Sequence, residues 1–179
     1  MVYVFLADGF EEIEALTPVD VLRRAGLDVR TVGVGSKRVT GSHRVEVTAD
    51  IEEGAVEFGN LQAVVLPGGL PGAVNLDRSQ SVQKAVARCF EDGGYVAAIC
   101  AAPSVLGHMG LLKGKRATCS PGFEKELLGA EFCDESVVAD GKIITGNGPG
   151  AAMPFALKLA EVLSGEETAR RLRKSMQCR

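Results

Sequence analysis

The chain has 179 residues, with 20 Lys and Arg against 23 Asp and Glu, a net charge of -3, and 46% hydrophobic residues. This length and composition suit one globular domain, which we assign to residues 1–179, and they exclude a disordered or low-complexity protein. The charge is too small and too dispersed for a nucleic-acid-binding surface, and no apolar run approaches the length of a membrane span.

Cysteine and histidine are placed in a way that argues against a metal site. The five cysteines form no Cys-x-x-Cys pair, and the chain has two histidines, His43 and His108. We therefore expect neither a structural zinc site nor a complete disulfide framework. The first residues, MVYVFLADGFEE, lack the basic start of a secretory signal and become acidic at once. These features favour a protein of the reducing cytoplasm.

The first half of the chain alternates strand-like and helix-like segments. Residues 2–7 form an apolar run typical of a buried strand, and residues 8–26 carry apolar side chains at helical spacing. A second strand is predicted at residues 27–35. Residues 43–53 alternate apolar and polar side chains, which is typical of a half-exposed strand or hairpin at an edge. Residues 61–69 predict a strand that ends in a Pro-Gly-Gly turn.

The second half continues this alternation. A helix is predicted at residues 79–94, which begin with a serine cap and end in glycines. A buried strand at residues 95–100 leads into a predicted helix at residues 101–112, with Pro103 in its first turn. The remaining predictions are strands at residues 115–120 and 141–147, and helices at residues 149–165 and 166–176.

The middle strands are apolar throughout, which is typical of parallel strands covered on both faces. The pattern therefore predicts an α/β, doubly wound domain. In such sheets ligands bind beyond the carboxyl ends of the strands. Three strand ends marked by small residues, at Asp8-Gly9, Gly68-Gly69 and Cys100, are expected to converge there.

Cys100 lies where a strand is predicted to become a helix. Unpaired N–H groups at a helix start favour a negative charge, so the pKa of a thiol there can fall below its ordinary value. Ala98, Ala101 and Ala102 are small enough for a tight turn that resembles the nucleophile elbow of hydrolases, with Cys in place of Ser. The alternative is that Cys100 is a small buried hydrophobic residue.

Three acids crowd the start of the first predicted helix. Glu11 and Glu12 are typical acids that complement the positive end of a helix. Glu14 lies between Ile13 and Ala15, at positions expected to be buried. A carboxyl group drawn toward the core tends to be protonated, and it could then donate a hydrogen bond to a thiolate.

Four segments carry a resemblance to a known family: GFEEIEALTPVDVLRRAG, VVLPGGLPGAVNL, VAAICAAPSVL and ITGNGPGAAMPFALKLAEVLSG. Their order and spacing resemble the ThiJ/PfpI superfamily, in the branch of the Parkinsonism-associated protein deglycase and its small bacterial relatives. The resemblance covers about residues 2–168. It implies a flavodoxin-like fold, related to class I glutamine amidotransferases, with a mostly parallel sheet between helices. It also implies a homodimer.

The resemblance assigns site residues one by one. The nucleophile falls on Cys100 and its partner acid on Glu14. The backbone N–H groups of Gly68, Gly69 and Ala101 would face a developing oxyanion.

Four further residues would line the pocket: Cys119, Ser120, Gly148 and Pro149. Some relatives carry a histidine at the position of Ser120, so a Cys-His dyad is not expected here. Cys119 is either a resolving thiol for an oxidised Cys100 or a thiol that only lines the pocket.

The activity implied is that of a glyoxalase or deglycase, which acts on small carbonyl compounds such as methylglyoxal, or on their adducts, without a metal or organic cofactor. The alternative is an oxidative-stress sensor or redox-regulated chaperone that uses oxidation of Cys100. No nucleic-acid or membrane partner is expected. Cys100 and Glu14 alone do not separate these two functions.

Overall fold

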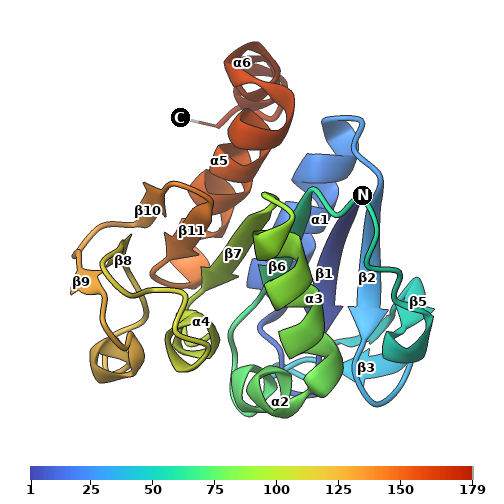
Figure 1. Ribbon diagram of the computed structural model, residues 1–179. Helices are drawn as coiled ribbons and strands as arrows, with labels where there is room; N and C mark the ends of the chain where they lie inside the picture. The colour runs from blue at the N-terminus through green and yellow to red at the C-terminus, as the bar shows by residue number, and fades with distance from the viewer. Residues whose placement is uncertain (179) are drawn as a thin grey trace.

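Short apolar strands pair into a seven-stranded sheet at the centre of the computed structural model, which describes residues 1–178 (Figure 1). The strand order is β10-β11-β7-β6-β1-β2-β5, and all neighbours are parallel except β10 and β11. Two small sheets, β3-β4 and β8-β9, lie outside it. The strands are β1 (Val2–Leu6), β2 (Val29–Gly33), β3 (Arg38–Thr40), β4 (Glu46–Thr48), β5 (Ile51–Glu52), β6 (Ala63–Leu66), β7 (Tyr95–Ile99), β8 (Arg116–Ala117), β9 (Glu131–Phe132), β10 (Val137–Asp140) and β11 (Ile143–Gly146).

Helices cover both faces of the large sheet (Figure 1). One core packs α1, α5 and α6 against the sheet, and the other packs α2, α3 and α4. The helices are α1 (Glu12–Arg24), α2 (Gly72–Arg78), α3 (Gln80–Glu91), α4 (Pro103–His108), α5 (Ala152–Ser164) and α6 (Glu166–Ser175), with short 3₁₀ helices η1 (Glu53–Ala55), η2 (Glu124–Glu126) and η3 (Pro149–Ala151). Within the described residues, every helix is too short or too polar to cross a bilayer.

The central strand β1 shows why both faces are apolar. Tyr3 and Phe5 point into the core with α2, α3 and α4, whereas Val4 and Leu6 point into the core with α1 and α5. Successive side chains of a strand face opposite sides, so a strand covered twice must be apolar at every position. The predicted doubly wound α/β fold is thus confirmed.

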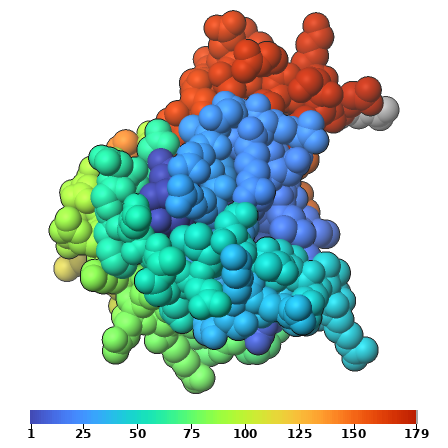
Figure 2. All heavy atoms as spheres, turned by 90° about the vertical axis from the view of Figure 1, so that its right-hand side faces the viewer, coloured from blue at the N-terminus to red at the C-terminus, as the bar shows by residue number. Residues whose placement is uncertain are grey.

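A view turned by 90° shows how the two ends of the chain are arranged (Figure 2). The first third of the chain, in blue to cyan, forms most of this face, and the C-terminal helices project above it. The segment predicted as an edge strand or hairpin, residues 43–53, holds β4 and β5, and β4 pairs in antiparallel register with β3, which lies before the predicted range. Ser79 caps α3 through its side chain, as expected, by accepting a hydrogen bond from the Val82 N–H.

Two elements are shorter than the pattern predicts. The helix expected at residues 101–112 is only α4, because Gly110 adopts a φ of 73° and ends it. The strand expected at residues 115–120 is limited to β8, because the next backbone N–H, that of Thr118, donates to the Thr145 side chain. Both β10 and α2 lie outside the predicted segments.

The core under α5 provides a test of the fold. Phe155 is fully buried there, so Phe155→Ala removes a large side chain and leaves a cavity. We expect the free energy of unfolding to fall by about 3–5 kcal/mol, as is usual for such truncations. Phe132→Ala is the matched control, because Phe132 is 44% exposed. Chemical denaturation measures both variants, and equal losses would contradict the assignment of α5 to the core.

Candidate functional site

Cys100 directly follows β7 in an unusual backbone conformation. Its φ of 65° lies in the left-handed region, which a residue with a Cβ atom seldom adopts. Its N–H donates to the Gly146 carbonyl at 2.9 Å, and its carbonyl accepts from the Ser120 N–H at 2.8 Å. Neighbouring segments on both sides therefore hold this strained turn, and such strain is typical of functional residues. The side chain is partly exposed, so Cys100 is presented at the turn and is not sealed in the core.

Glu14, in the first turn of α1, is fully buried, as its neighbours in the sequence suggest. Its Oε2 accepts a hydrogen bond from the Gly68 N–H at 2.9 Å. Its Oε1 is buried and has no ordinary hydrogen-bond partner among the described residues. The Cys100 thiol lies close enough to this carboxyl group for each to shift the pKa of the other. The acid and the sulfur thus form the expected pair.

Gly68 lies between the members of this pair. A Cβ atom on Gly68 would come within 2.7 Å of the Cys100 Cβ and 2.8 Å of the Glu14 Oε2. The neighbouring Gly69, with a φ of 85°, has backbone of Gly9 against it. The three strand ends predicted to converge therefore do meet at one edge of the sheet.

The expected oxyanion donors differ in what they do. The Gly68 N–H is already engaged by Glu14, so its expected role as an oxyanion donor is wrong. The Gly69 N–H points at the Cys100 sulfur and favours its charged form. The Ala101 N–H donates to no protein atom in the described part of the chain. Gly69 therefore provides a donor at the sulfur, and Ala101, the next residue along the chain, has a free N–H within the described residues.

The pKa values of Glu14 and Cys100 differ from those that the sequence suggests. Burial raises the pKa of Glu14 to about 7, although the Gly68 N–H and the thiol oppose this shift. Burial and, after it, the Glu14 charge raise the pKa of the Cys100 thiol to about 11. The Ser120 hydroxyl and the Gly69 N–H act in the opposite direction.

The expected lowering of the thiol pKa is therefore wrong for the resting pair. The helix after Cys100 begins only at Pro103 and has six residues, so it offers little charge stabilisation against burial. The pair loses its first proton near pH 7 and its second near pH 11. Near neutral pH the form with both protons and the form in which Glu14 is ionised are therefore both populated, which suits general-base chemistry.

The predicted pocket residues fall into two groups. Ser120 hydrogen-bonds the thiol, and Cys119 lies close enough for the Cys100 charge to act on it. Cys119 is only 3% exposed, and burial raises its pKa to about 12. Gly148 and Pro149 follow β11 beyond Gly146, and no hydrogen bond within the described residues joins them to Cys100.

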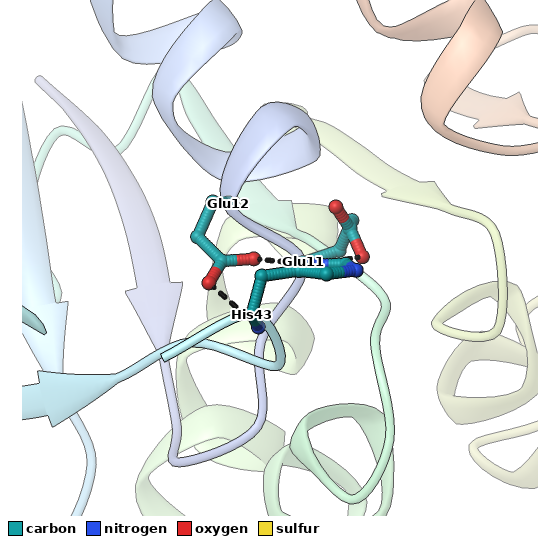
Figure 3. Close-up of side chains that lie close together, drawn as sticks. All are labelled: Glu11, Glu12 and His43. Carbon is teal, nitrogen blue, oxygen red and sulfur yellow. Dashed lines mark hydrogen bonds and ion pairs between the residues drawn. The ribbon is translucent and has the colours of Figure 1, made fainter. Parts of the chain in front are cut away.

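A second cluster, which the sequence pattern does not predict, lies at the start of α1 (Figure 3). Glu12 is only 8% exposed, so it does not lie free in solvent at the helix end. Burial alone would raise its pKa, but hydrogen bonds from the His43 side chain and from the His43 and Val45 N–H groups lower it to about 2. His43 lies 31 residues away in sequence, and only the β3-β4 hairpin brings it close. The spacing of residues along the chain carries no signal for this contact.

Comparison with known proteins identifies the family. The model of the DJ-1/PfpI family matches residues 1–162. Protein dj-1beta of Drosophila melanogaster is 40% identical over 176 residues, covering 97% of this chain and 94% of the relative. The Caenorhabditis elegans protein named glutathione-independent glyoxalase DJR-1.2 is 32% identical over 168 residues, covering 93% and 89%.

Solved structures agree with these relatives. Oxidised Toxoplasma gondii DJ-1 superposes with a TM-score of 0.94 at 36% identity, covering 98% of this chain and 97% of that chain. A DJ-1 superfamily protein from Salmonella typhimurium, solved as a Cys-to-Ala mutant, gives a TM-score of 0.93 at 37% identity over 98% and 97%. The mostly parallel sheet between helices is shared with these structures. By sequence and by fold, the chain belongs to the DJ-1/PfpI family.

Proposed function

We propose that this protein is a cofactor-independent glyoxalase or deglycase that acts on small 2-oxoaldehydes such as methylglyoxal, or on their adducts, through Cys100 and Glu14. The observation that carries the proposal is a buried carboxyl group, with a pKa of about 7, paired with a cysteine on a strained turn. The name of the C. elegans relative, a glutathione-independent glyoxalase, supports this chemistry.

The first step is addition of the thiol to the aldehyde. The Glu14 carboxylate takes the proton from the Cys100 sulfur as that sulfur forms a bond to the aldehyde carbon. A base with a pKa near the working pH is efficient in such transfers. The aldehyde oxygen becomes negatively charged and accepts hydrogen bonds from the Gly69 and Ala101 N–H groups. Glu14 then returns the proton to this oxygen, which gives a hemithioacetal.

The second step moves a hydrogen between the two substrate carbons. Glu14, again ionised, removes the proton from the carbon that carries sulfur, and the neighbouring carbon receives it. The hydroxyl proton on the first carbon passes to the oxygen of the neighbouring carbon, so the ketone becomes a hydroxyl group and the first carbon becomes a carbonyl. The product is a thioester of a 2-hydroxy acid. Water then cleaves the thioester, which releases the hydroxy acid and restores the Cys100 thiol. The sum is one aldehyde and one water converted to one acid, so no external oxidant or reductant is consumed.

The alternative function is a redox sensor or redox-regulated chaperone, in which Cys100 is oxidised. Two observations favour it: Cys100 is partly exposed, and the Toxoplasma relative was solved in an oxidised form. The raised pKa of the Cys100 thiol counts against it, because oxidation proceeds through the thiolate. We therefore place the enzymatic function first. A homodimer and a cytoplasmic location are further proposals that rest on family membership.

The two members of the pair should both be essential for turnover. We expect Cys100→Ser and Glu14→Gln each to lower lactate production from methylglyoxal by about a hundredfold or more, since each removes the nucleophile or the base. Cys133→Ser and Glu91→Gln are matched controls outside the site and should retain the wild-type rate. Wild-type rates in both site variants would rule out this mechanism.

The pH dependence of Cys100 alkylation distinguishes the role of Glu14 from that of Ser120. The Glu14 charge raises the pKa of the thiol, so Glu14→Gln should shift the alkylation profile to lower pH. The Ser120 hydrogen bond lowers that pKa, so Ser120→Ala should shift the profile to higher pH. Iodoacetamide labelling followed by peptide mass spectrometry measures the Cys100 rate in each variant.

In Glu14→Gln, alkylation and turnover should therefore change in opposite directions. The thiol becomes easier to ionise, but the base that the reaction needs is missing. A shift of the Glu14→Gln profile to higher pH would contradict this account. It would show instead that a protonated Glu14 stabilises the thiolate.

Peroxide treatment separates the enzyme from the sensor. We expect the fully reduced protein to turn over methylglyoxal, and we expect activity to fall in proportion to the oxidation of Cys100. Ready oxidation of a reduced protein that has no turnover would favour the sensor. No Cys100–Cys119 disulfide is expected on peptide mapping, because Cys119 is only 3% exposed. Its appearance would make Cys119 a resolving thiol.

A further inference from the structure

Three side chains from two distant segments converge at the start of α1 (Figure 3), and the Ser42 hydroxyl, which the figure does not draw, makes a fourth donor. The four donor atoms are the Glu11 Oε2, the Glu12 Oε2, the Ser42 Oγ and the His43 Nδ1. The His43 Nδ1 lies 2.9 Å from the Glu12 Oε2 and 3.5 Å from the Glu11 Oε2. The Ser42 Oγ lies 3.1 Å from the Glu11 Oε2, 3.3 Å from the Glu12 Oε2 and 3.1 Å from the His43 Nδ1.

These separations have the size of a tetrahedral coordination shell. Zinc bonds to nitrogen and oxygen are about 2.0–2.1 Å long, which places neighbouring donors of a regular tetrahedron about 3.3 Å apart. Five of the six separations run from 2.9 to 3.5 Å, and the sixth, between the Glu11 and Glu12 carboxylates, is within 4.8 Å. A small cation at the centre would therefore need only small movements of the side chains.

The supporting contacts hold this donor set in place. The second oxygen of Glu12, Oε1, accepts hydrogen bonds from the His43 N–H at 2.8 Å and the Val45 N–H at 3.3 Å. These bonds leave Oε2 facing the other donors. Gly41 has no room for a Cβ atom, because the Glu12 carboxyl group lies against it. The Ser42 N–H donates to the Phe10 carbonyl at 2.8 Å, which ties the hairpin to the loop before α1.

The site is closed on the protein side and open toward solvent. The side chains of Glu11 and Glu12 are only 12% and 10% exposed, whereas that of His43 is 70% exposed. The cluster borders a hollow of about 260 Å³ that is also lined by Ile13 and Val45. An ion can therefore enter past the imidazole, while the carboxylates are held rigidly.

Charge and donor type select the class of ion. Two carboxylates, a neutral imidazole and a hydroxyl sum to two negative charges, which one divalent cation neutralises. Mg²⁺ and Ca²⁺ require six or more oxygen donors, whereas four donors that include an imidazole suit Zn²⁺ and related first-row ions. We propose that Glu11, Glu12, Ser42 and His43 form a tetrahedral site for a divalent cation of the Zn²⁺ and Co²⁺ class.

This site is separate from the Cys100–Glu14 pair and does not depend on the proposed function. None of its four donors belongs to that pair. A bound ion would join the start of α1 to the β3-β4 hairpin, two segments that hydrogen bonds of Ser42, His43 and Val45 connect at this point. The ion thus has a structural role here, whatever reaction Cys100 performs.

Titration of the full-length protein with Co²⁺ tests the site, because tetrahedral Co²⁺ absorbs visible light strongly and thiolate ligation adds a charge-transfer band. We expect tetrahedral absorption without a thiolate band. His43→Ala should weaken Co²⁺ binding by about tenfold or more, since loss of even a supporting residue costs a metal site this much. His108→Ala is the matched control. Its Co²⁺ affinity should stay within about twofold of the wild-type value, well below the loss expected for His43→Ala.

Two further variants make the result decisive. Cys100→Ala should bind Co²⁺ as the wild type does, and Glu12→Gln should bind it more weakly. Circular dichroism checks that each variant is folded, and His43 is exposed enough to be replaced safely. A thiolate band, a Co²⁺ affinity that His43→Ala leaves unchanged, or no tetrahedral Co²⁺ spectrum at millimolar metal would each overturn the proposal.

Discussion

The candidate site depends on the absence of one side chain, at Gly68. The Gly68 N–H holds the Glu14 carboxyl group at 2.9 Å, and the missing Cβ atom leaves room for Cys100 and Glu14 to meet. Any larger residue would push the acid and the sulfur apart. The peptide of Gly68 also reaches α1 through its carbonyl, which accepts the Glu11 N–H at 3.0 Å. One peptide unit therefore aligns the helix, the acid and the nucleophile.

Burial of this pair decides which chemistry is available. If the turn acted mainly through its backbone N–H groups, Cys100 would be a stable thiolate and Glu14 a permanent acid. The structure differs from this picture, because α4 is short and the carboxyl group is enclosed. Burial raises the pKa of both the Glu14 carboxyl group and the Cys100 thiol. Glu14 then becomes a base near neutral pH, and the thiol is ionised only as it reacts. A thiol that stays protonated at rest also reacts more slowly with oxidants than a thiolate does.

Much of the architecture could be predicted from the sequence, because it depends on repeating patterns. Apolar strands alternating with amphipathic helices indicate a sheet covered on both faces, and the strand ends at Gly68 and Cys100 meet as predicted. Glu14 stood out because a charged residue occupied a position expected to be buried. The pKa values could not be predicted in the same way, since they depend on burial and on the sum of opposing hydrogen bonds. The engagement of the Gly68 N–H is equally a matter of three-dimensional geometry.

The cluster around His43 is a second feature that could not be predicted from the sequence. Reasoning about metals from sequence looks for closely spaced cysteines and histidines, and this chain has none. Here the donors come from adjacent acids at the start of a helix and from a hairpin 31 residues away. The segment of residues 11–14, at the start of α1, links this cluster to the sulfur, because Glu11 and Glu14 both hydrogen-bond Gly68 while Glu12 faces the hairpin. A change that moves the start of α1 would disturb both sites together, whereas a change confined to the exposed His43 would reach only one of them.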